Sequence, residues 1–315
     1  MNPDVIYILD EYVKQKHYRL LNSVLVYKNG EIVMERYYNK FTEKSRNNIK
    51  SIWKSILSVC AGIAVDKGYI KSIDEPIATY LPLFDGRNNP YHPYITVKHL
   101  LTMSSGIYWN GGVHYHCPMI EQFQRTRDRL SYLSDIKTDS LPGIKAVYKE
   151  WDVILLSAVL SAATGMNTFD FCDKFLYKPL GIESGRWFTY PDGVCYNIGI
   201  NAQQQAQSDL SARDLAKIGI LFQNSGYWNG ERIISDEYIK AALTPIDLTH
   251  GSTLKKQSYG YLWWIYPDGY GCSGFGGQQI TVIPERNIIY VLQATALSSH
   301  RDYSDAVGEI IDSFN

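Results

Sequence analysis

The sequence predicts an α+β fold in which both ends of the chain supply strands to one antiparallel sheet, flanked by helices. Runs of β-branched and aromatic residues separated by turn residues occur at 23–38 and again at 259–292. Between them lie apolar stretches long enough to form buried helices, at 52–64 and 151–164. Strands at both ends and helices in the middle are most simply explained by one sheet with a mostly helical segment inserted into it.

The N-terminal region predicts one helix and one hairpin. Apolar residues recur at helical spacing within 3–16, and two strands are expected at 23–27 and 31–38. The turn Lys28-Asn29-Gly30 joins these strands, and Asn-Gly between such runs is a strong hairpin signal. A helix that begins after Ser51 should end near Gly68, since glycine is favoured just beyond a helix C-terminus.

The middle and the C-terminal region differ in character. Residues 70–95 are rich in turn residues and 107–147 are irregular and polar, so both are expected to lack long elements. The other segments predict helices at 96–103, 151–164, 168–176, 210–223, 236–243 and 302–314, and strands at 259–266, 279–283 and 288–292.

This order of elements predicts a division into two domains. The sheet domain would be discontinuous, built from 1–66 and 245–315, and the mostly helical domain would span 67–244. A chain of 315 residues is long enough for one large domain or two modest ones.

Composition excludes several classes of function. The formal net charge is −1 and there is no basic block, so we expect no nucleic-acid partner. No stretch approaches the ~18 apolar residues that a membrane-spanning helix needs, and the first residues lack the pattern of a signal peptide. Five cysteines at irregular spacing argue against a disulfide framework, so a reduced, cytoplasmic protein is expected.

One segment could suggest a metal site. His114, His116 and Cys117 place three ligand types within four residues. No second ligand pair or carboxylate partner follows at the spacing of a known zinc motif, so we predict neither a metal nor an organic cofactor.

The segment that carries chemistry is Ser51-Ile52-Trp53-Lys54, at the head of a long apolar run. Positions i and i+3 share one face of a helix, so the hydroxyl of Ser51 and the amine of Lys54 can touch. A serine needs such a neighbour to take its proton, and the helix N-terminus favours negative charge on its oxygen. The alternative is a serine that caps the helix, followed by a lysine that reaches to solvent. Two further copies, at Ser134/Lys137 and Ser252/Lys255, lie in polar sequence.

Six more segments follow the Ser51 motif along the chain. They are Val97–Gly106 with its Leu-Leu-Thr-Met-Ser-Ser-Gly, Pro142-Gly143, Tyr148-Lys149-Glu150, Arg213-Asp214-Leu215-Ala216, Tyr259–Trp264, and Gly274-Phe275-Gly276-Gly277-Gln278. Taken in this order, the seven segments resemble the class C β-lactamase, esterase and D,D-peptidase branch of the serine penicillin-recognising superfamily. The Trp-Trp and Gly-x-Gly-Gly-Gln pieces resemble most its esterase-like and aminohexanoate-oligomer hydrolase members. The resemblance implies the β-lactamase/transpeptidase-like fold.

The resemblance also implies roles for the residues that match. Ser51 would attack a carbonyl and become acylated, with Lys54 and Tyr148 beside it, and the backbone N–H groups of Ser51 and Phe275 would form the oxyanion hole. Free lysine and tyrosine have pKa values of ~10.4 and ~10, so neither is a base at neutral pH unless its surroundings change that. A close pair would titrate jointly, so we assign the proton to the pair and not to one member.

Two departures from the family pattern concern substrate binding. The literal Lys-Thr-Gly of β-lactamases is absent, and Cys272-Ser273-Gly274 would take its place. Glu150 stands where the family often has a neutral residue. If Glu150 points inward, it should raise the pKa of Lys54 and disfavour substrates with a carboxylate there; the alternative is that it faces solvent at the start of the next helix. We predict that Glu150, Cys272, Ser273 and Gly274 contact the substrate.

These observations predict a serine hydrolase that cleaves an ester or amide bond of a small molecule or short peptide through a Ser51 acyl-enzyme. A β-lactamase or D,D-peptidase is the second hypothesis, and a catalytically silent binding protein of the same fold is the third. Function depends on the site and not on the fold alone.

Overall fold

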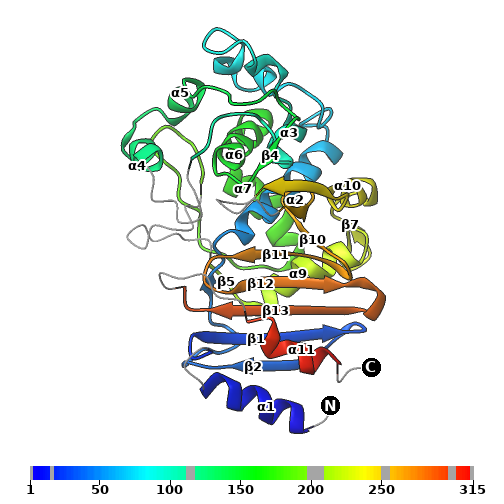
Figure 1. Ribbon diagram of the computed structural model, residues 1–315. Coiled ribbons are helices and arrows are strands. Elements are labelled where there is room, and N and C mark those ends of the chain that lie inside the picture. The colour runs from blue at the N-terminus through cyan, green and yellow to red at the C-terminus, as the bar shows by residue number, and fades with distance from the viewer. Residues whose placement is uncertain are drawn as a thin grey trace.

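The protein is built around one nine-stranded sheet (Figure 1). The computed structural model describes residues 3–14, 18–110, 118–196, 209–249, 256–296 and 303–312. The strand order is β2-β1-β13-β12-β11-β10-β9-β8-β4, antiparallel throughout except where β4 pairs with β8. The strands of this sheet are β1 (Leu21–Lys28), β2 (Glu31–Tyr37), β4 (Ala146–Val147), β8 (Ile246–Thr249), β9 (Lys256–Tyr259), β10 (Trp264–Tyr266), β11 (Gly269–Gly274), β12 (Gln278–Ile283) and β13 (Ile288–Ala294).

Helices lie on both faces of the sheet and form a separate group above it in Figure 1. They are α1 (Pro3–Lys14), α2 (Ile52–Asp66), α3 (Val97–Leu101), α4 (Pro118–Arg125), α5 (Arg129–Ser134), α6 (Trp151–Thr164), α7 (Thr168–Cys172), α8 (Lys178–Leu180), α9 (Ala212–Gln223), α10 (Asp236–Ala242) and α11 (Asp305–Asp312). Two short two-stranded sheets pair β3 (Asn47–Asn48) with β5 (Asp209–Leu210) and β6 (Tyr227–Trp228) with β7 (Glu231–Arg232).

Both ends of the chain supply strands to one sheet, as predicted, and they meet near its β2 edge. β1 pairs with β13 along its length, and the β1–β2 hairpin continues the sheet on the other side. Asn29 and Gly30 have φ angles of +50° and +93°, the left-handed conformation that a tight hairpin turn requires. The hairpin prediction at 23–38 is therefore confirmed.

Alternate residues of the strands pack into two different cores. Leu25 of β1 faces the large core, whereas its neighbours Val24 and Val26 face a smaller one with Leu9 of α1 and Val307 of α11. This period of two is what a sheet covered on both faces requires. α9 packs against β1, β12 and β13 on the side of the large core.

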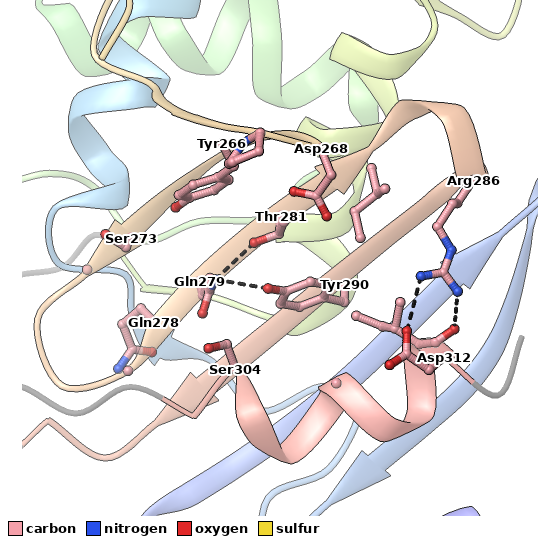
Figure 2. A pocket seen from close by; sticks show the side chains of 16 residues that line it. Tyr266, Asp268, Ser273, Gln278, Gln279, Thr281, Arg286, Tyr290, Ser304 and Asp312 are labelled. Atoms are coloured by element: carbon pink, nitrogen blue, oxygen red, sulfur yellow. Dashed lines mark hydrogen bonds and ion pairs between the residues drawn. The ribbon is translucent and has the colours of Figure 1, made fainter. Parts of the chain in front are cut away.

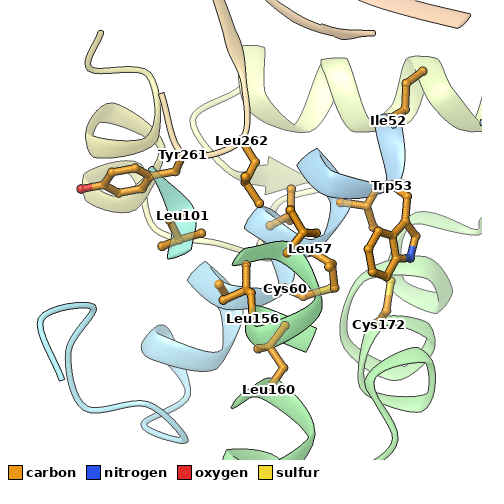
Figure 3. Packing of buried hydrophobic residues seen from close by; sticks show 14 of the residues in the cluster. Ile52, Trp53, Leu57, Cys60, Leu101, Leu156, Leu160, Cys172, Tyr261 and Leu262 are labelled. Atoms are coloured by element: carbon orange, nitrogen blue, oxygen red, sulfur yellow. The ribbon is translucent and has the colours of Figure 1, made fainter. Parts of the chain in front are cut away.

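α2 runs through the large core and is buried from Ile52 to Ala64. Its residues Leu57 and Cys60 pack beside Leu156 and Leu160 of α6 (Figure 3). A side chain at Gly62 would place its Cβ 2.5 Å from Ile234, so glycine is needed for the close approach of the α10 region. The buried helix predicted behind Ser51 is present, with its first residues held rigidly by packing.

The structure differs from the sequence prediction mainly in the C-terminal half. The strand expected over 259–266 is interrupted after Tyr259, because Leu262 adopts φ +63° and the Ser55 hydroxyl donates to its carbonyl at 2.6 Å. The residue pattern does not indicate β11, since a strand with three glycines has little β-propensity, and only the family resemblance implies a strand at 272–274. Within 107–147, where no long element was expected, α4 and α5 form two short helices.

The predicted division into two domains remains a prediction. Most helices of 67–244 lie in the upper group of Figure 1, but α9 belongs to this segment and covers the sheet.

A hollow of about 530 Å³ lies on the outer face of the sheet beside α11 (Figure 2). Ser273, Gln279, Thr281 and Tyr290 of the sheet line it together with Ile311. Gln279 Nε2 donates to Thr281 Oγ1 at 2.9 Å and to the Tyr290 hydroxyl at 3.1 Å. The floor of the hollow is therefore polar, on the side of the sheet opposite to α2.

The described residues bear on the expectations about membrane-spanning helices, cysteines and metal ligands. None of the helices described is by itself long and apolar enough to cross a membrane. Cys60, Cys172, Cys195 and Cys272 are buried free thiols. No group of three or more potential metal ligands occurs among the described residues, and His114, His116 and Cys117 lie outside them.

Candidate active site

Ser51 stands at the entry to α2 and its hydroxyl does not cap the helix. The residue before it, Lys50, adopts φ +52°, a left-handed conformation that turns the chain sharply into the helix. Ser51 Oγ accepts a hydrogen bond from Lys54 Nζ at 3.1 Å. The side chain of Lys54 is only 4% exposed, so it does not reach to solvent. The alternative of a capping serine with a solvent-directed lysine is therefore wrong.

Lys54 lies at the centre of a buried polar group. Its Nζ is 2.8 Å from Glu150 Oε1, and the Glu150 side chain is 6% exposed. The Tyr196 hydroxyl donates to the other carboxylate oxygen of Glu150 at 2.9 Å. Lys54 Nζ also lies 5.3 Å from the centre of the Tyr148 ring. Glu150 therefore points inward, and of its two predicted orientations the solvent-facing one is wrong.

Two opposing effects act on the charge of Lys54. Burial alone would lower its pKa, but the Glu150 carboxylate and Tyr148 favour the ammonium form and together raise the pKa above the ordinary value of 10.5. Burial, reinforced by the charge of Glu150, raises the pKa of Tyr196 well above its usual value, so this hydroxyl stays protonated as a donor. Lys54 and Glu150 thus form an ion pair at neutral pH.

Tyr148 is placed by the last strand of the sheet. It follows β4, and its backbone N–H donates to Thr249 O at 2.9 Å. Its ring stacks on Trp264 with 5.8 Å between centroids and meets Tyr259 edge-on at 6.2 Å. These contacts fix the direction of the ring, which is 8% exposed. The predicted residues Ser51, Lys54 and Tyr148 are thus brought together.

The glycine-rich strand β11 approaches the same point from the sheet. A Cβ at Gly274 would lie 2.4 Å from Ile49 O and 2.9 Å from Lys50 Cβ, both directly before Ser51. Phe275 follows immediately, so its backbone lies next to the start of α2. Gly276 and Gly277 adopt φ +85° and +96° in the turn that leads into β12. Such angles favour glycine over any side-chain-bearing residue.

Replacing Gly274 with alanine should lower the reactivity of Ser51 by at least about tenfold, because its Cβ would push β11 away from the start of α2. The rate of covalent labelling of Ser51 measures this. Gly308→Ala is the matched control, because nothing lies within 4 Å of a Cβ at that position. Equal rates for the two variants would show that the close approach of β11 does not matter.

The side chains of Cys272 and Ser273 lie on opposite faces of β11. Cys272 is 2% exposed, and burial raises the pKa of its thiol to about 12 despite a contact with Ser55. Ser273 faces the opposite side of the sheet, where it lines the hollow of Figure 2. Substrate binding by these two residues remains a prediction, and only their backbone groups are placed to serve it.

The buried side chain of Gln278, which follows the turn at Gly276 and Gly277, hydrogen-bonds to Asn47 and Ala294. Its Oε1 accepts from Asn47 Nδ2 at 3.1 Å, and its Nε2 donates to Ala294 O at 2.6 Å. Asn47 Nδ2 donates to the same carbonyl at 2.6 Å. Gln278 is 1% exposed, so its amide is engaged in holding the glycine turn against β13.

The other copies of the serine–lysine motif do not form such a pair where they are described. Ser134 Oγ donates to Ser131 O, and Lys137 Nζ lies over the Tyr108 ring. Ser252 and Lys255 lie outside the described residues. Tyr196 is not recognisable from the sequence, because a tyrosine 46 positions after Glu150 carries no local signal of the contact.

Comparisons with known proteins identify the family of the chain. Residues 9–312 match the beta-lactamase family. The 6-aminohexanoate-dimer hydrolase of Paenarthrobacter ureafaciens is 22% identical over 292 residues, which cover 86% of this chain and 71% of that protein.

Solved structures share the fold. A Bacillus anthracis protein provisionally described as a 6-aminohexanoate-dimer hydrolase superposes with a TM-score of 0.77 at 19% identity, covering 97% of this chain and 81% of that one. The octameric penicillin-binding protein homologue of Pyrococcus abyssi gives a TM-score of 0.74 at 21% identity, with 99% and 78% covered. The match to the family spans nearly the whole chain, and the protein therefore belongs to the beta-lactamase family, within the serine β-lactamase and penicillin-binding protein superfamily.

Proposed function

We propose that this protein is a serine hydrolase that cleaves an ester or amide bond of a small substrate through an acyl-enzyme on Ser51. The observation that carries the proposal is the buried amine of Lys54, 3.1 Å from Ser51 Oγ at the start of α2. A hydroxyl beside a buried amine at a helix N-terminus is an arrangement suited to nucleophilic catalysis when that amine, or the tyrosine next to it, is in its basic form. The amide hydrolase from Paenarthrobacter among its relatives supports the same class of reaction.

The proposed reaction begins when Ser51 Oγ attacks the substrate carbonyl carbon and gives its proton to the Lys54–Tyr148 pair. The backbone N–H groups of Ser51 and Phe275 would hold the negative oxygen of the tetrahedral intermediate, where one such donor typically contributes ~10²–10³ in rate. The proton then passes to the departing alcohol or amine as the bond breaks. A water molecule attacks the ester on Ser51 and releases the acid. No metal or organic cofactor has a step in this scheme.

Glu150 bears on the choice of substrate. It brings a carboxylate to within 2.8 Å of Lys54 Nζ, and Cys272 supplies no cation where β-lactamases carry a lysine. The Lys54 ammonium is already paired with this carboxylate, so a substrate with its own carboxylate beside the scissile bond would gain no free cation from the pair. We therefore expect neutral esters, amides and short peptides to be better substrates than β-lactams. We expect neither nucleic acids nor membranes among its partners. The cytoplasm remains the predicted compartment.

The proposal predicts that a fluorophosphonate will add one phosphonyl group to the folded protein and none to Ser51→Ala. Intact mass measured after incubation tests it, because such probes react with activated serines and not with ordinary ones. Penicillin in a parallel incubation examines the β-lactamase and D,D-peptidase hypothesis by stable acylation or turnover. Folded wild-type protein without any adduct would contradict the covalent mechanism and favour the silent binding protein, in which Glu150 holds Lys54 as an ammonium ion.

A further inference from the structure

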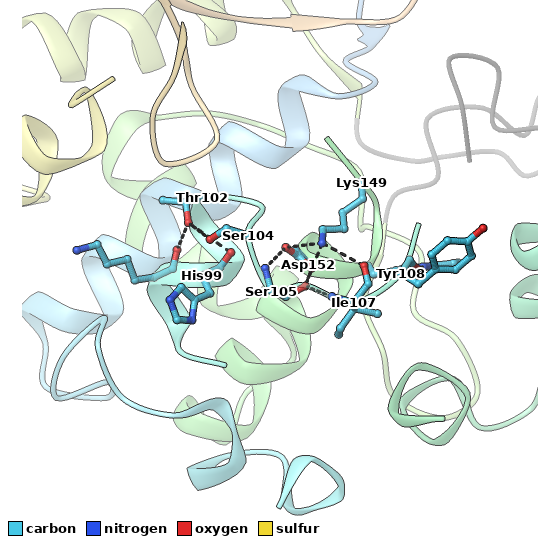
Figure 4. A network of polar contacts seen from close by, with 10 residues as sticks. His99, Thr102, Ser104, Ser105, Ile107, Tyr108, Lys149 and Asp152 are labelled. Carbon is cyan, nitrogen blue, oxygen red and sulfur yellow. Dashed lines mark hydrogen bonds and ion pairs between the residues drawn. The ribbon is translucent and has the colours of Figure 1, made fainter. Parts of the chain in front are cut away.

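The residue between Tyr148 and Glu150 points away from the Ser51 group. Lys149 is 2% exposed, and its Nζ lies 3.2 Å from Ser105 Oγ, 3.2 Å from Ile107 O and 3.7 Å from Asp152 Oδ2 (Figure 4). Two of the ammonium protons thus have hydrogen-bond acceptors, and the Asp152 carboxylate balances the charge as an ion-pair partner. Three consecutive side chains are thus fixed, two toward Lys54 and the middle one in the other direction.

Asp152 completes this second buried group. It is fully buried, and both of its oxygens accept from Ser105, one from the hydroxyl and the other from the backbone N–H at 3.2 Å. Ser105 Oγ also accepts from Ile107 N at 3.2 Å. The loop at 105–107 and the first turn of α6 are therefore tied to each other through Lys149 and Asp152.

A buried ion pair of this kind is costly to form. Desolvation offsets most of the attraction between the charges, and apolar residues of similar volume often stabilise a fold as well or better. What a complete polar network adds is a single allowed geometry, since each donor must meet its own acceptor. That geometry is useful here because Tyr148 and Glu150 must both reach Lys54.

We propose that Lys149 and Asp152 are positioning residues that hold Tyr148 and Glu150 against Lys54. This inference rests on the proposed function. Lys149 holds the backbone between Tyr148 and Glu150 by its contacts in the second buried group. Two further hydrogen bonds hold its neighbours: the Tyr148 N–H donates to Thr249 O, and the Tyr196 hydroxyl donates to Glu150. Loosening the Lys149–Asp152 pair would let both side chains drift from Lys54 without removing any group that touches the substrate.

The chain contains a matched control at the head of α9. Asp214 accepts from the Ser211 hydroxyl at 2.7 Å and pairs with Lys217 at 2.9 Å, and Lys217 Nζ also donates to Gly181 O. This group repeats the serine, aspartate, lysine and backbone carbonyl of the Lys149 group, with the same three-residue spacing between the charges. It lies on a helix that covers the sheet, and among the described residues none of its hydrogen bonds or ion pairs involves Ser51, Lys54 or Tyr148.

The test compares Asp152→Asn with Asp214→Asn in the rate and pH dependence of fluorophosphonate labelling, corrected for the folded fraction of each protein. We expect Asp152→Asn to lower the maximal labelling rate by at least about tenfold and to shift the pH of half-maximal labelling. Asp214→Asn should leave the rate within about threefold and the midpoint within about 0.3 pH units of wild type. Equal effects of the two substitutions, or an Asp152→Asn rate within threefold of wild type, would overturn the inference.

Ser105→Ala is the milder variant if Asp152→Asn does not fold, because it removes one hydroxyl and keeps both charges. Its control is Ser211→Ala, and the same tenfold difference is expected between them. Labelled wild-type protein with an unaffected Ser105→Ala would refute the positioning role alone. Wild-type protein that is not labelled at all would instead refute the proposed function, so the two failures are distinguishable.

Discussion

Replacing Lys54 with methionine will lower the rate of Ser51 labelling by a fluorophosphonate by about 10²–10⁴-fold, the usual contribution of a positioned acid or base. Methionine retains much of the apolar length of lysine but cannot accept the proton of Ser51 Oγ, which lies 3.1 Å from the amine. The Tyr148 ring would remain in place but would lose the ammonium group 5.3 Å from its centre. The measurement is the second-order rate constant for labelling, taken at a pH above which the rate no longer increases.

The same substitution will also destabilise the fold. It leaves the Glu150 carboxylate buried without its partner, and breaking a buried ion pair from one side typically costs about 3–5 kcal/mol. The Tyr196 hydroxyl still donates to Glu150, so the loss should fall toward the lower end of this range. Urea unfolding of Lys54→Met and wild type measures the difference.

The double variant Lys54→Met/Glu150→Gln separates the two effects. Removing both charges should recover most of the stability, because no unpaired charge is left buried. Labelling should stay as slow as in Lys54→Met, because the missing base is not restored. A double variant labelled at the wild-type rate would show that Lys54 takes no part in activating Ser51, whatever its distance from the hydroxyl.

Most of the fold could be predicted from the sequence because its elements have strong local periods. The apolar run behind Ser51 became α2, and the turn at Asn29-Gly30 joined the two expected strands. The predictions failed in regions where contacts between residues far apart in the sequence determine the local structure. Tyr259 and Trp264 lie in one aromatic run, yet a turn that rests on the Ser55 hydroxyl separates them.

The site was predictable in its residue types but not in the direction of each side chain. Spacing within a helix brings Ser51 and Lys54 together, and this needs no tertiary information. Lys149 and Glu150 are two adjacent charged residues, and nothing local says which one faces Lys54. The outcome depends on Ser105 and Tyr196, which are separated from them by 44 and 46 positions. Sequence order alone cannot show these contacts.

Replacing Glu150 with glutamine will shift the pH dependence of Ser51 labelling toward lower pH by roughly one to three pH units, the usual effect of one nearby opposite charge. Burial lowers the pKa of Lys54, and the Glu150 carboxylate, with Tyr148, reverses this. Without that carboxylate the burial effect dominates, so Lys54 loses its proton at a lower pH and becomes available as a base. Labelling rates measured from about pH 6 to above the ordinary lysine pKa of ~10.4 give the midpoint.

Glu183→Gln is the control, because the Glu183 side chain is 89% exposed and pairs only with Arg46 among the described contacts. It removes the same charge from the surface and should leave the midpoint unchanged. An unchanged midpoint in Glu150→Gln would mean that the ion pair does not govern the charge of Lys54.

The stability of the two proteins should respond to pH in the corresponding way. The folded-state pKa of Lys54 lies above its ordinary value of 10.5, so the stabilisation from the ion pair is complete below that pH and is lost as the pH rises through the folded value. Wild-type protein should therefore lose stability above pH 10.5 more steeply than Glu150→Gln, which has no such pair to lose. Parallel unfolding curves in this range would contradict an ion pair between Lys54 and Glu150. A steeper wild-type curve combined with an acid-shifted labelling midpoint in the variant would mean that the carboxylate stabilises the fold by keeping the base of the site protonated.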